Sequence, residues 1–152
     1  MRVENMTIAK PVVSKFGGSS LADAGQFRKI DYIIKQNPNR RYIVPSAPGK
    51  RNPDDVKVTD LLYACYDKAK HGEPYEEYLN QIRQRYQEII EELGLHLSLK
   101  DELKVLENSF VRGIGREYAA SRGEYLNGIL LAAHLDYEFV DDASVPRSHK
   151  AG

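Results

Sequence analysis

The stretch from residue 10 to residue 45 constrains the fold most, because it reads as strand, glycine turn, helix and strand in immediate succession. The apolar run before the turn predicts a strand from Lys10 to Phe16. A second apolar run predicts another strand over residues 41–44. Between them, apolar residues recur every three or four positions, which predicts an amphipathic helix that ends near Asn37. The apolar positions are Leu21, Ala24, Phe27, Ile30 and Ile34. A strand–helix–strand unit of about 35 residues implies a parallel sheet with a right-handed crossover.

The turn after the first strand has the composition of an anion site. Gly17 and Gly18 have no Cβ, so the backbone there can bend sharply and approach a ligand closely. Free N–H groups at a following helix start carry partial positive charge, and Lys15 adds a full charge. Ser19 and Ser20 could bond a phosphate oxygen or cap the helix, and Ser20 could form a capping pair with Asp23. The stretch is not a P-loop, and an ordinary turn with glycines and a surface lysine would have the same composition.

The second strand should end at the same edge of the sheet as the first. In open parallel sheets, ligands bind beyond the carboxyl ends of the strands. Lys15, Gly17, Gly18, Ser19 and Ser46 are therefore expected to converge there. A plain loop serine is the alternative interpretation of Ser46.

The rest of the chain is mostly helical by pattern. Apolar periodicity predicts helices over about 58–70, 73–93, 98–110 and 124–134. Thr59 is a suitable N-cap for the first of these, and Gly94 a suitable stop for the second. Glu124 is expected in the first turn of the last helix, where the helix dipole favours a carboxylate. Residues 137–140 are predicted to form a third strand.

Composition narrows the class of protein. The chain has 152 residues, enough for one domain with a core. Its 22 basic and 22 acidic residues cancel, which argues against a nucleic-acid or anionic-membrane partner. No apolar run approaches the roughly 20 residues that a membrane span needs, and the first ten residues lack the apolar core of a signal peptide. The single cysteine, Cys65, excludes an internal disulfide and is expected in the core, so a cytoplasmic protein is expected. No metal site is expected from adjacent Asp54 and Asp55, because their side chains diverge.

Two motifs, which follow each other in the same order as in the family, resemble those of the aspartate kinases of the amino-acid kinase superfamily. The first is residues 15–20, KFGGSS, preceded by two valines; the second is residues 121–124, SRGE, with the helical pattern after it. The resemblance covers residues ~10 to 142, the first part of that family's catalytic domain. It implies an α/β three-layer sandwich with a parallel sheet. Residues 10–145 would then be the N-terminal, amino-acid-substrate part of the domain, with residues 1–9 a leader and residues 146–152 a tail.

The resemblance also implies an activity. It is phosphoryl transfer from ATP, with Mg²⁺, to the β-carboxylate of L-aspartate, the first step of lysine, threonine and methionine biosynthesis. Glu124 would pair with the α-ammonium of aspartate, and magnesium ligands are not identifiable in the sequence. The resemblance assigns catalytic roles to Lys15, Gly17 and Gly18, and substrate-binding roles to Ser19, Ser46, Thr59 and Glu124.

Two other functions fit the same residues. One is a kinase for another acidic amino acid, such as glutamate or acetylglutamate. The other is a catalytically inactive aspartate-binding or interaction module, because the family's Gly/Thr-rich segment and most of its nucleotide pocket have no counterpart in this sequence. A sheet of three strands would leave an open edge, so a homo-oligomer or a complementing partner is expected to cover it.

Overall fold

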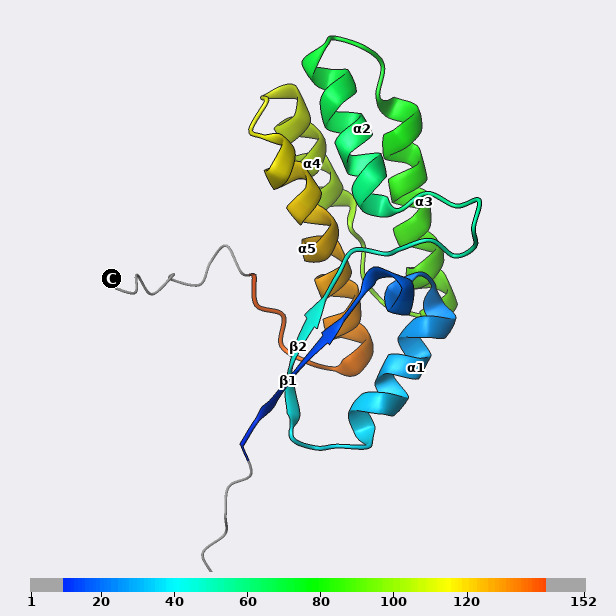
Figure 1. Cartoon of the computed structure of the whole chain (residues 1–152). Helices are drawn as coiled ribbons and strands as arrows, with labels where there is room; N and C mark the ends of the chain where they lie inside the picture. Colours follow the sequence, from blue (N-terminus) through cyan, green and yellow to red (C-terminus); the bar gives the residue numbers. More distant parts are fainter. Residues whose placement is uncertain (1–9, 142–152) are drawn as a thin grey trace, which may run out of the picture.

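The computed structural model of the chain describes residues 10–141 (Figure 1). The leader at residues 1–9 and the tail at residues 146–152 lie outside the described residues, so those two expectations stay predictions. The elements in chain order are β1 (Val12–Phe16), the 3-10 helix η1 (Gly18–Leu21), α1 (Ala24–Lys35), β2 (Arg40–Pro45), α2 (Val58–Lys70), α3 (Glu76–Leu93), α4 (Lys100–Val111) and α5 (Arg116–Leu135).

The strand–helix–strand unit forms as predicted. β1 and β2 pair in parallel, with Lys15 opposite Val44 and Phe16 opposite Pro45. α1 makes the crossover between them (Figure 1). Both strands therefore end at one edge of the sheet, which confirms the predicted α/β class with a parallel sheet.

The predicted third strand at residues 137–140 is wrong. Within residues 10–141 the sheet has two strands, and this segment is irregular. α5 ends at Leu135, and Asp136 then takes the left-handed conformation with φ 56°. Side chains hold the segment instead: the Phe139 ring packs edge-on against Tyr125 at 5.5 Å between centroids, and the Tyr137 hydroxyl donates to the carbonyl of Arg40 at 3.1 Å.

Two helix starts differ from the prediction. Ser20 does not cap α1; Asp23 is the N-cap, and its carboxylate accepts a hydrogen bond from the Gln26 N–H at 3.0 Å. Thr59 does not cap α2, because Lys57 occupies the cap position and Thr59 lies inside the first turn. That earlier start is fixed by the preceding loop, since the N–H of Val58 donates to the carbonyl of Pro48 at 3.1 Å.

α5 begins much earlier than the sequence pattern predicted. Gly113 and Gly115 take positive φ angles of 62° and 144°, conformations that favour glycine, and the helix begins directly after them at Arg116. Glu124 is then in the third turn of α5. The expected stabilisation of Glu124 by the helix dipole is therefore wrong, because that effect is confined to the first turn.

The core lies among the helices and along one face of the sheet. The predicted apolar faces of α3 and α4 are buried, and Gly94 ends α3 with φ 65° as expected. β2 contacts α5, which also packs against α1 and α2 (Figure 1). Cys65 is fully buried, as predicted, and burial raises the pKa of its thiol to about 12. No helix among residues 10–141 combines the length and apolar character needed to cross a membrane.

The other face of the sheet is uncovered within the described residues. Phe16 and Ile43 point into the core. Val13, Tyr42 and Val44 are 64%, 59% and 44% exposed. Apolar side chains on a sheet face normally pack against another layer.

Candidate functional site

The carboxyl edge of the sheet brings the first group of predicted site residues together. Lys15 is exposed near the end of β1, and Ser46 directly follows β2. The Ser46 N–H donates to the carbonyl of Phe16 at 3.0 Å, so the two backbone segments stay paired one residue beyond β2. Gly17 is extended, with φ −75° and ψ 169°, and leads into η1. The predicted convergence of these residues at one edge is thus present in the backbone.

The two glycines of the turn serve different purposes. A Cβ built on Gly17 would meet nothing within 4 Å, so space beside Gly17 is open to a ligand. A Cβ on Gly18 would lie 3.0 Å from the carbonyl oxygen of Ala47. Within residues 10–141, the N–H groups of Gly17, Gly18 and Ser19 donate no backbone hydrogen bond. The turn therefore presents donors that could bind an anionic oxygen.

Gly49 supports this turn from the neighbouring segment. Its N–H donates to the carbonyl oxygen of Gly18 at 2.8 Å. A Cβ on Gly49 would lie 2.6 Å from the carbonyl carbon of Gly18, so the two backbones cross in contact. The sequence analysis did not predict this supporting role of Gly49.

α5 and α2 reach the same segment from the other side. A Cβ on Gly123 would lie 2.7 Å from the Cβ of Ala47 and 3.0 Å from Leu62 of α2. Glu124 is the next residue along α5, and it is exposed. Thr59 lies in the first turn of α2, partly exposed. The backbone thus places Glu124 and Thr59 on the elements that flank Ala47, although no hydrogen bond or ion pair joins their side chains within residues 10–141.

Asn127 is a further residue of this region that the sequence analysis missed. It is fully buried, and its Nδ2 donates to the carbonyl oxygen of Ser46 at 2.8 Å. Its Oδ1 is buried and has no hydrogen-bond partner among the described residues. The available signal was an amide at a core position of a helix, next to Leu126 and before Leu130. A buried amide usually fixes a specific partner, here the residue that follows β2.

Arg85 and Tyr86 of α3 also reach the site and were missed. Arg85 is 4% exposed, and its Nη2 donates to the carbonyl of Gly49 at 2.7 Å. The Tyr86 hydroxyl donates to the carbonyl of Gly123 at 2.8 Å. The signal for Arg85 was a charged residue in the apolar stripe between Ile82 and Ile89.

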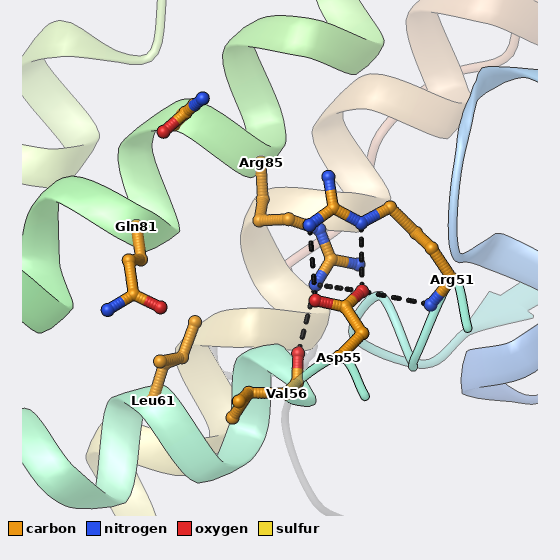
Figure 2. Close-up of a pocket in the computed structure, with 7 residues that line it drawn as sticks. Arg51, Asp55, Val56, Leu61, Gln81 and Arg85 are labelled. Atoms are coloured by element: carbon orange, nitrogen blue, oxygen red, sulfur yellow. Dashed lines mark hydrogen bonds and ion pairs between the residues drawn. The ribbon is translucent and has the colours of Figure 1, made fainter. Parts of the chain in front are cut away.

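A cluster of charges surrounds Arg85. Figure 2 shows Arg51 and Arg85 converging on the carboxylate of Asp55, which Arg51 contacts through Nε at 2.8 Å and Nη2 at 3.1 Å. Arg85 Nη1 lies 3.3 Å from the same carboxylate. The cluster lines a pocket of about 200 Å³ that contains none of the predicted site residues. We therefore assign it a structural role.

Protonation of Asp55 should cost stability. The hydrogen bond from Arg51 holds the pKa of Asp55 well below its ordinary value of 3.8. A carboxyl group whose pKa is lower in the folded state contributes stability above its unfolded pKa and loses it as the pH falls towards the folded pKa. Asp55→Asn should reduce the free energy of unfolding by about 1–2 kcal/mol at pH 7, a value discounted for the partial exposure of Arg51.

Denaturant unfolding at pH 7 and pH 3 measures this effect. The difference between wild type and Asp55→Asn should shrink at pH 3, and the exposed neighbour variant Asp54→Asn should behave like wild type at both pH values. An equal loss at pH 7 and pH 3 would show that the ion pair does not carry the effect.

The described residues fit an anionic oxygen better than a metal ion. Lys15 and the turn at Gly17 offer a cation and backbone donors at one edge of the sheet. No group of three or more His, Cys, Asp or Glu side chains within residues 10–141 is arranged to hold a metal. The Mg²⁺ that the resemblance implies therefore has no ligand set of this kind among these residues.

The parallel sheet, its helical layer and the glycine turn at the carboxyl edge make this an α/β chain, and its structural neighbours are aspartokinases of amino-acid kinase-like fold. Aspartokinase 3 of Bacillus subtilis is 35% identical over 136 residues, which cover 84% of this chain and 30% of that protein. The Clostridium acetobutylicum aspartate kinase, an allosteric enzyme, superposes with a TM-score of 0.83 at 50% identity, over 87% of this chain and 30% of that one. Escherichia coli aspartokinase III in complex with aspartate and ADP superposes with a TM-score of 0.65 at 27% identity, over 84% and 29% of the two chains.

The chain is thus related to the aspartokinases, which confirms the resemblance carried by its two motifs. It spans about 30% of the length of the relatives it matches. No model of a protein family matches the chain.

Proposed function

We propose that the chain contributes the amino-acid side of an aspartate kinase site, which transfers a phosphoryl group from ATP to the β-carboxylate of L-aspartate. The observation that carries the proposal is the carboxyl edge of the sheet, where Lys15, the open turn at Gly17 and Ser46 meet. The relationship to aspartokinases supports it, and the E. coli relative binds aspartate and ADP. A cytoplasmic location is part of the same proposal.

Phosphoryl transfer depends on positioning and charge neutralisation rather than on covalent chemistry by the protein. The Lys15 ammonium neutralises charge on the transferring group. The free N–H groups of Gly17 and Gly18 donate to its oxygens. ATP supplies the phosphoryl group, and Mg²⁺, when bound, screens the phosphate charge; neither the nucleoside nor the metal is placed by the described residues.

The amino-acid substrate lies on the α2 and α5 side of the edge in this proposal. Ser19, Ser46 and Thr59 orient its carboxylates, and Glu124 holds its ammonium group. A carboxylate suits that task because it binds a cation strongly without reacting with it. Glu124 is exposed on α5, so its carboxylate can reach a ligand without a buried charge being left unpaired.

Glu124→Gln should raise the KM for aspartate by about 10- to 100-fold, because the variant loses a charge-assisted hydrogen bond to the substrate ammonium. Glu117→Gln is the matched control. Glu117 is exposed on the same face of α5, two turns earlier and about 10 Å away. Steady-state ADP release with varied aspartate, and calorimetric titration with aspartate, give the measurement. A similar KM for aspartate in both variants would show that Glu124 does not bind the substrate. Tight aspartate binding without turnover would favour the inactive binding module.

We also propose that a second copy of this chain covers the exposed sheet face at Val13, Tyr42 and Val44. Light scattering over a concentration series should then reveal self-association of the purified chain. A monomer at every concentration would contradict coverage by a second copy.

A further inference from the structure

The guanidinium of Arg85 bonds three backbone carbonyls from two segments that meet behind the glycine turn. Nη2 donates to the carbonyls of Gly49 at 2.7 Å and Ala22 at 3.2 Å. Nη1 donates to the carbonyl of Val56 at 3.0 Å. Ala22 directly follows η1, while Gly49 and Val56 lie in the loop between β2 and α2. One side chain therefore ties the end of the turn to the loop that supports it.

A buried arginine is costly unless its charge and donors are matched. Arg85 is 4% exposed, and burial lowers the pKa of its guanidinium, which nonetheless stays charged. Asp55 lies 3.3 Å away and supplies the counter-charge, and Arg51 fixes Asp55 in turn (Figure 2). An apolar residue at this helix position would pack without that cost, so the arginine points to a need for its three backbone contacts.

The contacts of Arg85 lead directly to the turn. Gly49 accepts a hydrogen bond from Arg85 through its carbonyl and donates one to Gly18 through its N–H. The Gly18 and Gly49 backbones are in van der Waals contact, with no space for a side chain on Gly49. Movement of Gly49 would therefore shift Gly18 and the donors beside it.

Tyr86, the next residue of α3, makes a similar contact on the α5 side of the site. The Tyr86 hydroxyl, fully buried, donates to the carbonyl of Gly123 at 2.8 Å. Gly123 packs against Ala47 and precedes Glu124. Arg85 thus supports the turn at Gly18 through Gly49, and Tyr86 supports the backbone next to Glu124 through Gly123.

We propose that Arg85 is a positioning residue for the phosphate-facing turn and that Tyr86 is a positioning residue for the aspartate-facing part of α5. This inference rests on the proposed function for its kinetic consequences and on the geometry alone for its structural ones. Neither side chain touches substrate. Arg85 acts on the step in which charge develops on the phosphoryl group, and Tyr86 acts on the binding of the amino acid.

The variant Arg85→Lys tests the positioning role of Arg85. Lysine keeps the charge beside Asp55, but its single ammonium cannot bond the carbonyls of Gly49, Ala22 and Val56 in the fork geometry of a guanidinium. We expect kcat to fall at least tenfold while the KM for aspartate changes less than twofold. Tyr86→Phe should show the opposite pattern, with KM for aspartate raised about fivefold and kcat changed less than twofold.

Amide hydrogen exchange gives a readout that does not need activity. In Arg85→Lys the Gly49 amide should exchange at least tenfold faster than in wild type, and in Tyr86→Phe it should not change. Circular dichroism at the assay temperature establishes that both variants are folded.

The possible results distinguish failure of the positioning roles from failure of the proposed kinase function. Faster exchange at Gly49 together with unchanged kcat would overturn the positioning role of Arg85 and leave the proposed function standing. The same loss of kcat in both variants would overturn the division between the two residues. If wild type shows no turnover, the proposed function fails, and unchanged protection of the Gly49 amide in Arg85→Lys would still overturn the structural link.

Discussion

Replacing Lys15 with alanine should lower kcat for aspartate-dependent ADP release about 100- to 1,000-fold, the usual cost of removing one preorganised electrostatic contact to a transition state. Lys15 lies near the carboxyl end of β1, two residues before the open space at Gly17. Lys15 makes no hydrogen bond or ion pair within residues 10–141, so its loss should leave the free energy of unfolding within about 0.5 kcal/mol of wild type. Stopped or steady-state assays of ADP release, together with a thermal melt, measure both quantities.

Lys104→Ala is the control for the loss of a surface charge. Lys104 is exposed on α4, which belongs to the helical part of the fold rather than to the sheet edge. It should match wild type in both assays. If Lys15→Ala retained full turnover, or if it unfolded the chain, the role assigned to Lys15 would be wrong.

Gly49→Ala should lower the free energy of unfolding by about 2–3 kcal/mol, because an added methyl group has to push apart two backbones that are already in contact. The new Cβ would lie 2.6 Å from the carbonyl carbon of Gly18 and 2.8 Å from its oxygen. Backbone cannot rotate away as a flexible side chain can. Turnover should fall as well, since the displaced segment carries the donors at Gly17 and Gly18.

Gly25→Ala provides the matched glycine substitution. Gly25 is exposed in the first turn of α1, and its new Cβ would meet only the carboxylate of Asp23, at 3.3 Å. Alanine also favours helix by up to about 1 kcal/mol, so this variant should be as stable as wild type or more so. Chemical denaturation of both variants gives the comparison. Equal stability of Gly49→Ala and wild type would show that the crossing at Gly18 is looser than described.

Local patterns predicted the parts of the fold that depend on local physics. Two short apolar runs predicted both strands, and apolar residues every three or four positions between them predicted the crossover helix. The apolar faces of α3 and α4 followed from the same helical spacing. Gly94 was predicted as a helix stop because glycine takes the left-handed conformation without strain. The placement of Ser46, directly after β2, at the same edge as the end of β1 followed from the rule that parallel strands finish at one edge.

The features that the sequence analysis missed are of two kinds: local backbone conformations and contacts between distant segments. The early start of α5 reflects two glycines with positive φ angles, whose conformations are not visible in hydrophobic periodicity. Residues 137–140 have a strand-like composition, yet Phe139 packs on Tyr125 and no strand pairs with them in the described chain. Gly49 and Arg85 support the site through backbone contacts that only the folded chain brings together.

The most direct test of the proposed function is ADP release from ATP and Mg²⁺ by the purified protein in the presence of aspartate, glutamate, acetylglutamate or no amino acid. We expect release that depends on aspartate, with the other two acids at the level of the blank. Release that is faster with glutamate or acetylglutamate would contradict the assignment of the substrate. Absence of aspartate-dependent release from a folded protein would contradict the proposed kinase activity.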